Sequence, residues 1–197
     1  RREFSVSIWV KTAITNTDQG LLCANENGTN GTFAIYTRSS ASCGTSTNVV
    51  EVTIPTSSGL ARYISANNTF TKDWQHLMLT WSNGLSPVLY INGRQDQPLT
   101  HVLSWTGVLT NCPQFVVGKA PGIPNSWNGL VDDVRVYPRR LSPTEVAALA
   151  SLPPANYGAI VNAGGTNVTV PRTVGGLWAV TARSRIVLSS EVRNFLR

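Results

Sequence analysis

Residues 4–10 alternate between apolar and small or polar side chains, with Trp9 as the exception. Successive side chains of a strand point to opposite sides of a sheet, so this segment is predicted to be a strand with one buried face. The side chains on that face are Phe4, Val6, Ile8 and Val10. Further strands are predicted at residues 21–23, 33–37, 49–54, 61–65, 74–81, 88–91 and 115–118. Pro55 is expected to end the fourth of these eight strands, and Asn92-Gly93 is a strong hairpin signal.

Residues 127–149 (WNGLVDDVRVYPRRLSPTEVAAL) place a longer strand directly before a short helix. Pro138 cannot donate to a sheet, so the strand is predicted to end there. Ser142, Pro143 and Glu145 have the spacing of a capping box with proline at the first helical position, which predicts a helix start. Alternation along the strand predicts one common face, formed by Leu130, Asp132, Val134 and Val136.

Five segments, in this order along the chain, resemble strands of the laminin-G-like jelly-roll family, also called the concanavalin-A-like lectin/glucanase superfamily. They are residues 4–11 (FSVSIWVK), 74–81 (WQHLMLTW), 88–94 (VLYINGR), 115–118 (FVVG) and 127–149, and the resemblance covers about residues 4–150. It implies an all-β fold, a jelly roll in which two antiparallel sheets form a β-sandwich with one short C-terminal helix. It fixes no function, because this fold carries many unrelated activities.

The composition changes after residue 152, where Pro153 and Pro154 are expected to end the helix. Glycines then mark a linker, and strand-like runs follow at residues 166–170 and 177–189. The predicted units are a laminin-G-like domain over residues 1–152 and a linker with a β-rich extension over residues 153–197.

Members of the family usually carry a strand ahead of the one that Phe4 opens, and in sequence order that strand would need residues before Arg1. A sandwich that lacks this strand exposes an unpaired edge, which favours association. Three sources of the strand stay open: residues 159–190 of the same chain, a neighbouring chain that adds a strand, or a segment upstream of Arg1. The second source would make the protein a homo-oligomer.

Composition narrows the class of protein. Only 13% of the 197 residues are charged, and Ser, Thr, Asn and Gly are abundant, which is typical of secreted, cell-surface or virion proteins. No apolar run reaches the roughly eighteen residues of a membrane span. The net charge is +6, but no DNA-binding motif accompanies it, so nucleic acid is not an expected partner. The redox state of Cys23, Cys43 and Cys112 stays open, and a Cys23–Cys43 disulfide is one alternative.

The acidic residues do not form a catalytic pair. Glycoside hydrolases place two carboxyl groups around the glycosidic bond. Of the ten acids here only Asp132 and Asp133 are close in sequence, and adjacent strand residues point to opposite sides of a sheet. The chain has no Gly-x-Ser-x-Gly motif, and His76, inside a predicted strand, is expected to be a packed or hydrogen-bonded side chain. We therefore expect no enzymatic activity and no catalytic residue.

Exposed aromatic rings with polar neighbours are the expected carbohydrate-binding groups. The candidates are Trp105, Trp127, Asn125, Asn128, Tyr36 and Arg38. For both tryptophans the alternative is that they close the open end of the core. The resemblance also implies a structural Ca²⁺ site, with Asp132 and Asn128 as candidate ligands, and Ca²⁺ needs roughly six to eight oxygens. The alternative is that Asp132 accepts hydrogen bonds from loop backbone.

The sequence thus predicts a non-enzymatic module for adhesion or carbohydrate binding, with a glycan as its partner, on an extracellular, cell or virion surface. The alternative is a structural subunit of an assembly, such as a phage capsid decoration or tail-fibre protein. Its partner would be a neighbouring subunit, joined by strand addition. A third hypothesis, a glycoside hydrolase, lacks the paired carboxylates.

Overall fold

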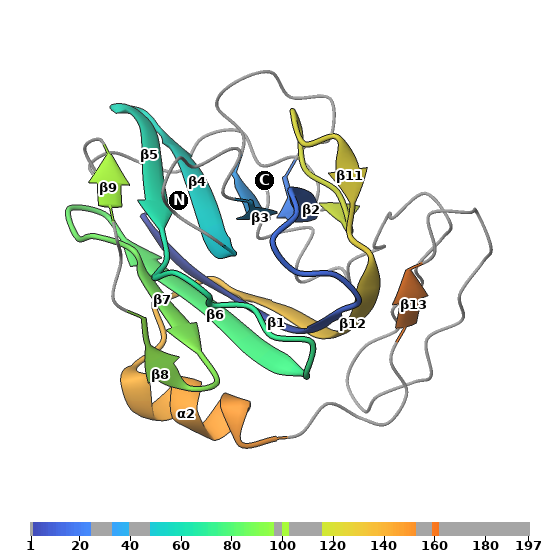
Figure 1. The fold of residues 1–197 in the computed structure, drawn as a ribbon. Coiled ribbons are helices and arrows are strands. Elements are labelled where there is room, and N and C mark those ends of the chain that lie inside the picture. Colours follow the sequence, from blue (N-terminus) through green and yellow to red (C-terminus); the bar gives the residue numbers. More distant parts are fainter. Residues whose placement is uncertain are drawn as a thin grey trace.

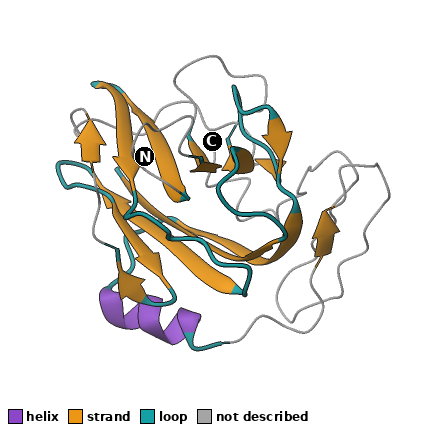
Figure 2. Cartoon of the chain, viewed as in Figure 1, coloured by secondary structure: helices purple, strands orange, loops and turns teal. Residues whose placement is uncertain are grey.

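Two antiparallel sheets and one short helix make up the described part of the chain, as Figure 1 shows. The structure is a computed structural model of the chain. It describes residues 2–24, 33–39, 48–96, 100–102, 116–152 and 159–161. In the described residues, strands predominate over the single helix (Figure 2), and the prediction of an all-β sandwich with one short helix is confirmed.

Sheet A has six strands. In spatial order they are β13 (Ala159–Val161), β12 (Gly129–Tyr137), β1 (Glu3–Thr12), β6 (Gln75–Ser82), β7 (Val88–Ile91) and β8 (Arg94–Gln95). Strand β1 lies between β12 and β6 and is antiparallel to both. The predicted hairpin between β7 and β8 is confirmed, with φ of 52° at Asn92 and 78° at Gly93.

Sheet B has seven strands. Six of them follow one another in space: β10 (Val116–Val117), β2 (Gln19–Cys23), β3 (Ala34–Arg38), β4 (Val49–Thr56), β5 (Gly59–Ile64) and β9 (Thr100–Val102). The seventh, β11 (Asn125–Ser126), pairs in parallel with β2. The predicted end of a strand at Pro55 is wrong, because Pro55 lies within β4 opposite Leu60 of β5. The pairing of β4 with β3 stops at Thr53, so the missing N–H of Pro55 interrupts no bond on that side.

The core lies between the facing sides of the two sheets. The four predicted side chains of β1 belong to it, and each is at most 1% exposed: Phe4, Val6, Ile8 and Val10. Phe4 meets Phe33 with ring centroids 5.3 Å apart and Trp81 with centroids 5.7 Å apart. Burial of one such side chain stabilises the fold by about 1.5–3 kcal/mol, so the alternation along β1 is a large part of what joins the sheets.

Strand β12 contains a β-bulge. Its register with β1 shifts between Ser7 and Trp9, where β12 has one residue more than β1. Asp133 lies at this place with a φ of 48°, which aspartate tolerates better than most residues. The bulge moves all later side chains to the other face, so the predicted common face of β12 is wrong. Asp132 lies on the outer side opposite Trp9, and the side chains packed against the core are Val131, Val134 and Val136.

Helix α2 (Pro143–Ala150) covers part of the outer side of sheet A, where Val146 packs with Met78 and Tyr90. The helix start follows from the predicted capping box, which is confirmed. The Ser142 hydroxyl accepts a hydrogen bond from the backbone N–H of Glu145 (3.3 Å), and the Glu145 carboxylate accepts one from the backbone N–H of Ser142 (2.8 Å). In the described residues, no helix is long and apolar enough to cross a membrane.

Strand β13 pairs antiparallel with residues 129–131 of β12, at the edge of sheet A. Of the three open sources of an edge strand, this short segment belongs to the first, the tail of the same chain. The predicted strands at residues 166–170 and 177–189 lie outside the described residues, as do Cys43 and Cys112.

Candidate ligand-binding site

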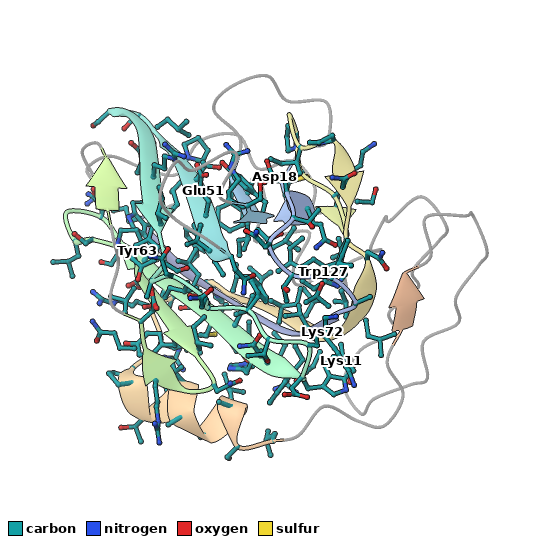
Figure 3. All side chains as sticks on the ribbon, viewed as in Figure 1. Lys11, Asp18, Glu51, Tyr63, Lys72 and Trp127 are labelled. Atoms are coloured by element: carbon teal, nitrogen blue, oxygen red, sulfur yellow. The ribbon has the colours of Figure 1, made fainter. Side chains whose placement is uncertain are left out.

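The outer side of sheet B carries a cluster of four charged side chains and one tyrosine. It comprises Asp18, Tyr36, Arg38, Glu51 and Arg62, and we call it the arginine–carboxylate cluster. Tyr36 lies directly opposite Glu51 in the pair formed by β3 and β4, and Arg38 falls on the same side because it is two residues further along β3. Figure 3 labels Asp18 and Glu51 in the upper half of the view, at sheet B.

Glu51 lies at the centre of the cluster and is 2% exposed. Its Oε1 accepts hydrogen bonds from the Tyr36 hydroxyl (2.8 Å) and from Nε of Arg62. Its Oε2 accepts from Nε of Arg38 (2.9 Å) and from Nη2 of Arg62 (2.9 Å). A buried carboxylate is costly unless it is paired and hydrogen-bonded, and these contacts meet that need.

Arg38 links Glu51 to a second carboxylate. Its Nη1 donates to Oδ2 of Asp18 (3.2 Å), and its guanidinium carbon lies 5.3 Å from the ring centroid of Tyr36, within the range of a cation–π contact. The other carboxylate oxygen of Asp18 accepts from the backbone N–H of Ser39 (2.7 Å). The side chains of Arg38, Arg62 and Asp18 are 21%, 33% and 14% exposed, so the buried Glu51 holds partly exposed groups in place.

The pKa values in the cluster follow from burial and from these contacts. Burial alone would raise the pKa of Glu51, but hydrogen bonds from Arg62 and Tyr36 and the charges of Arg62 and Arg38 outweigh it, and the pKa lies below its ordinary value. Burial and the Glu51 carboxylate raise the pKa of Tyr36 far above its ordinary value. At neutral pH the Glu51 carboxylate is therefore charged and the Tyr36 hydroxyl is neutral.

Strand β11 brings Asn125 beside the cluster. Asn125 lies opposite Gln19, and its amide Nδ2 donates to the backbone carbonyl of Asp18 (3.0 Å). The chain reaches this place by crossing Gly20, where a Cβ atom would lie 2.0 Å from the backbone nitrogen of Ala120. Gly20 is thus required by the close approach of two backbone segments.

Replacement of Gly20 by Ala is expected to lower the free energy of unfolding by about 2–3 kcal/mol, because the methyl group would have to displace backbone. Gly122 is the control: its φ of 69° is unfavourable for alanine, but no atom lies within 4 Å, so we expect a loss of about 1 kcal/mol. Urea unfolding of both variants measures the difference. Equal losses would contradict the close contact at Gly20.

A family model described as the concanavalin A-like lectin/glucanases superfamily matches residues 1–147. The chain belongs to the concanavalin A-like lectin/glucanase superfamily. No curated protein sequence matches the chain significantly.

Solved structures share the fold of this superfamily member. Domain 4 of AbnA, a GH43 extracellular arabinanase from Geobacillus stearothermophilus, in complex with arabinotriose, is 23% identical with a TM-score of 0.54, over 76% of this chain and 66% of that one. The binding domain of Paraclostridial Mosquitocidal Protein 1 is 20% identical (TM-score 0.54), over 76% of this chain and 37% of that one. Ruminococcus gnavus IT-sialidase CBM40, bound to alpha2,3 sialyllactose, is 16% identical (TM-score 0.56), over 76% of this chain and 83% of that one. This chain therefore spans only 66% and 37% of the first two, and the likeness shows the fold alone.

Three of the six residues predicted to bind glycan in this superfamily member lie together. Tyr36 and Arg38 belong to the arginine–carboxylate cluster, and Asn125 contacts the backbone of Asp18. Asn128 is exposed, and its backbone N–H donates to Oε1 of Gln19 (2.7 Å). Trp105 lies outside the described residues.

Trp127 lies in the core and is 1% exposed, as the alternative prediction for this residue had it. Its ring centroid is 5.7 Å from that of Phe70, and its Nε1 donates to the backbone carbonyl of Leu130 (3.2 Å). Its ring therefore presents no face on which a sugar could stack. The cluster instead contains three residues that the sequence did not single out: Asp18, Glu51 and Arg62.

Asp132 lies in strand β12 and Asn128 directly precedes that strand, and Ca²⁺ binding by these two residues stays a prediction from the resemblance. Asp132 lies on the outer side of sheet A, where its Oδ1 accepts a hydrogen bond from the backbone N–H of Asp133 (2.8 Å), the next residue of the same strand and not a loop residue. Within the described ranges, no group of three or more His, Cys, Asp or Glu side chains could hold a metal ion.

His76 also faces the outer side of sheet A. Its Nε2 is hydrogen-bonded to the Ser7 hydroxyl at 2.8 Å, and both residues are 1% exposed. Burial lowers the pKa of His76 to about 4, while Asp133 acts in the opposite direction and Arg135 in the same one. The side chain is thus packed and hydrogen-bonded, as predicted.

Proposed function

We propose that the protein is a non-enzymatic carbohydrate-binding module of an extracellular, cell or virion surface, and that the arginine–carboxylate cluster binds the glycan. The observation behind this proposal is that buried Glu51 fixes two partly exposed guanidinium groups beside Asp18. Polar groups that are already ordered lose little conformational entropy on binding, and they can offer both donors and acceptors to sugar hydroxyls.

Domains of similar fold give a second line of support. Two of them are described with bound oligosaccharides, arabinotriose in one and alpha2,3 sialyllactose in the other. A third is described as the binding domain of Paraclostridial Mosquitocidal Protein 1. The same fold thus serves as a binding module in other proteins, and the proposed site lies on one of its two sheets.

The charge state of Glu51 supports a binding role over hydrolysis. A glycoside hydrolase needs one protonated carboxyl group, whose pKa is raised, to act as the general acid. The contacts of Glu51 lower its pKa instead, and both of its oxygens are occupied by Arg and Tyr side chains. The nearby Asp18 carboxylate is paired with Arg38.

Replacement of Arg38 by Gln is expected to weaken glycan binding at least tenfold, since a hydrogen bond from a charged group contributes about 1.5–3 kcal/mol. A glycan array with the full chain identifies the ligand, and calorimetry then compares the variants. Trp105→Ala is included, because stacking by Trp105 stays a prediction from the sequence.

Arg139→Gln is the matched control. Arg139 lies between strand β12 and helix α2 and forms an exposed ion pair with Glu145, so its loss removes the same charge away from the cluster. We expect this variant to bind like the unchanged chain. Thermal unfolding shows that each variant is folded. Undiminished binding by folded Arg38→Gln and Arg62→Gln would refute the proposed site, and no bound glycan at all would refute the function.

A further inference from the structure

We infer that the arginine–carboxylate cluster selects neutral sugars and discriminates against glycans that carry a carboxylate. The inference rests on the proposed function and names the ligand class of that site. It follows from how the charges of the described residues in the cluster are already paired.

The charges of the cluster balance. It contains two guanidinium groups, on Arg38 and Arg62, and two carboxylates, on Asp18 and Glu51. Tyr36 adds no charge, because burial and the neighbouring Glu51 carboxylate raise the pKa of its hydroxyl. A ligand that arrives at this surface therefore meets alternating charges with a sum of zero.

The arginine edges that usually hold a carboxylate are occupied. Arginine binds a carboxylate best through two parallel N–H groups. Arg62 already uses Nε and Nη2 on the two oxygens of Glu51. Arg38 uses Nε on Glu51 and Nη1 on Asp18. A sugar carboxylate would have to displace one of these protein carboxylates or lie next to it.

Adding a third negative charge beside the two carboxylates is unfavourable. Glu51 cannot move away, since it is 2% exposed and hydrogen-bonded on both oxygens. Like charges a few Å apart in a partly buried site repel by an amount that changes affinity about tenfold or more. A sugar hydroxyl has no such cost, because it can donate to Asp18 and accept from a guanidinium group.

The segments next to the cluster in sequence bring no compensating positive charge. Residues 40–47, which join β3 to β4, and residues 103–115, which precede β10, contain no Lys or Arg. Residues 25–32 contain one charged side chain, Glu26. Lys119 follows β10 and is exposed, so solvent and salt screen its charge.

The test is an array of paired oligosaccharides, each neutral glycan printed beside the same glycan with one added sialic or uronic acid, at about 0.15 M salt. With the full chain we expect each bound pair to favour the neutral member about tenfold or more. Calorimetry with the best pair gives the ratio of the two affinities. Asp18→Asn removes one negative charge and keeps an oxygen for the backbone N–H of Ser39, so it should shift this ratio about tenfold toward the acidic member.

Glu145→Gln is the matched control, because it makes the same change in net charge on helix α2 and should leave the ratio unchanged. Tighter binding of the acidic members by the unchanged chain would overturn the inference and leave the proposed function intact. An unchanged ratio in folded Asp18→Asn would also overturn it. Failure to bind any glycan would instead refute the proposed function, and the inference with it.

Discussion

Replacement of Glu51 by Gln is expected to lower the free energy of unfolding by about 3 kcal/mol. The substitution removes the negative charge that lies between the guanidinium groups of Arg38 and Arg62. Removal of one partner of a buried ion pair costs roughly 3–5 kcal/mol, and the lower end applies here because both arginines reach solvent. Urea unfolding at neutral pH measures the loss.

The lowered pKa of Glu51 also makes the stability of the fold depend on pH. The pKa of Glu51 is lower in the folded chain than in the unfolded one, so its contribution is complete above the ordinary value of 4.5 and is lost as the pH falls below it. His76 acts earlier. Its pKa is about 4 in the folded chain and 6.5 in the unfolded chain, so the unfolded chain takes up the proton first and stability falls between these two values.

Substitution can separate the contributions of Glu51 and His76 to the pH dependence of stability. Glu51→Gln should be less stable at neutral pH, should keep the decline between about pH 6.5 and 4, and should lose part of the decline below that range. Glu145→Gln is the control for stability at neutral pH only, because Glu145 lies at the surface and contacts with Arg139 and Ser142 lower its pKa to about 2 as well. A Glu51→Gln chain that unfolds at the same urea concentration as the unchanged chain would contradict the claim that the ion pairs of Glu51 stabilise the fold.

The sheets could be predicted from the sequence because their periodicity is simple. In β1 every second residue is apolar, and the structure buries that set without a break. In β12 the same rule failed after Asp132, since the bulge at Asp133 adds one residue and reverses every later side chain. A bulge depends on pairing with another strand, so alternation within one strand does not reveal it.

The site could be predicted only in part, for a related reason. Tyr36 and Arg38 were predicted as an aromatic ring and a polar neighbour of the kind that bind sugars. Glu51 was missed because its position opposite Tyr36 depends on the register between β3 and β4. Ten residues separate these two strands, and a connection of that length does not fix a register as a two-residue turn does. Alternation along β4 predicts that Glu51 points away from the core, because its neighbours Val50 and Val52 face the core. This alternation is the signal from which Glu51 could have been predicted.

Replacement of Trp127 by Ala is expected to lower the free energy of unfolding by about 4 kcal/mol, the typical loss for a large aromatic residue removed from a core. The ring is buried in the core beside Phe70, and its Nε1 donates to the carbonyl of Leu130. Trp127→Phe keeps much of the volume and loses the hydrogen bond, so a loss of about 1–2 kcal/mol is expected.

Glycan binding separates this core role from the stacking role that the sequence also allowed. Calorimetry at a temperature where Trp127→Phe is folded should give an affinity within about twofold of the unchanged chain. The reason is that the ring is 1% exposed, whereas the proposed site on the outer side of sheet B is built from Arg38, Arg62 and Asp18. A Trp127→Ala chain that kept its stability and lost its glycan would place the ring at the ligand, and the binding site would then lie at the end of the sandwich and not on the face of sheet B.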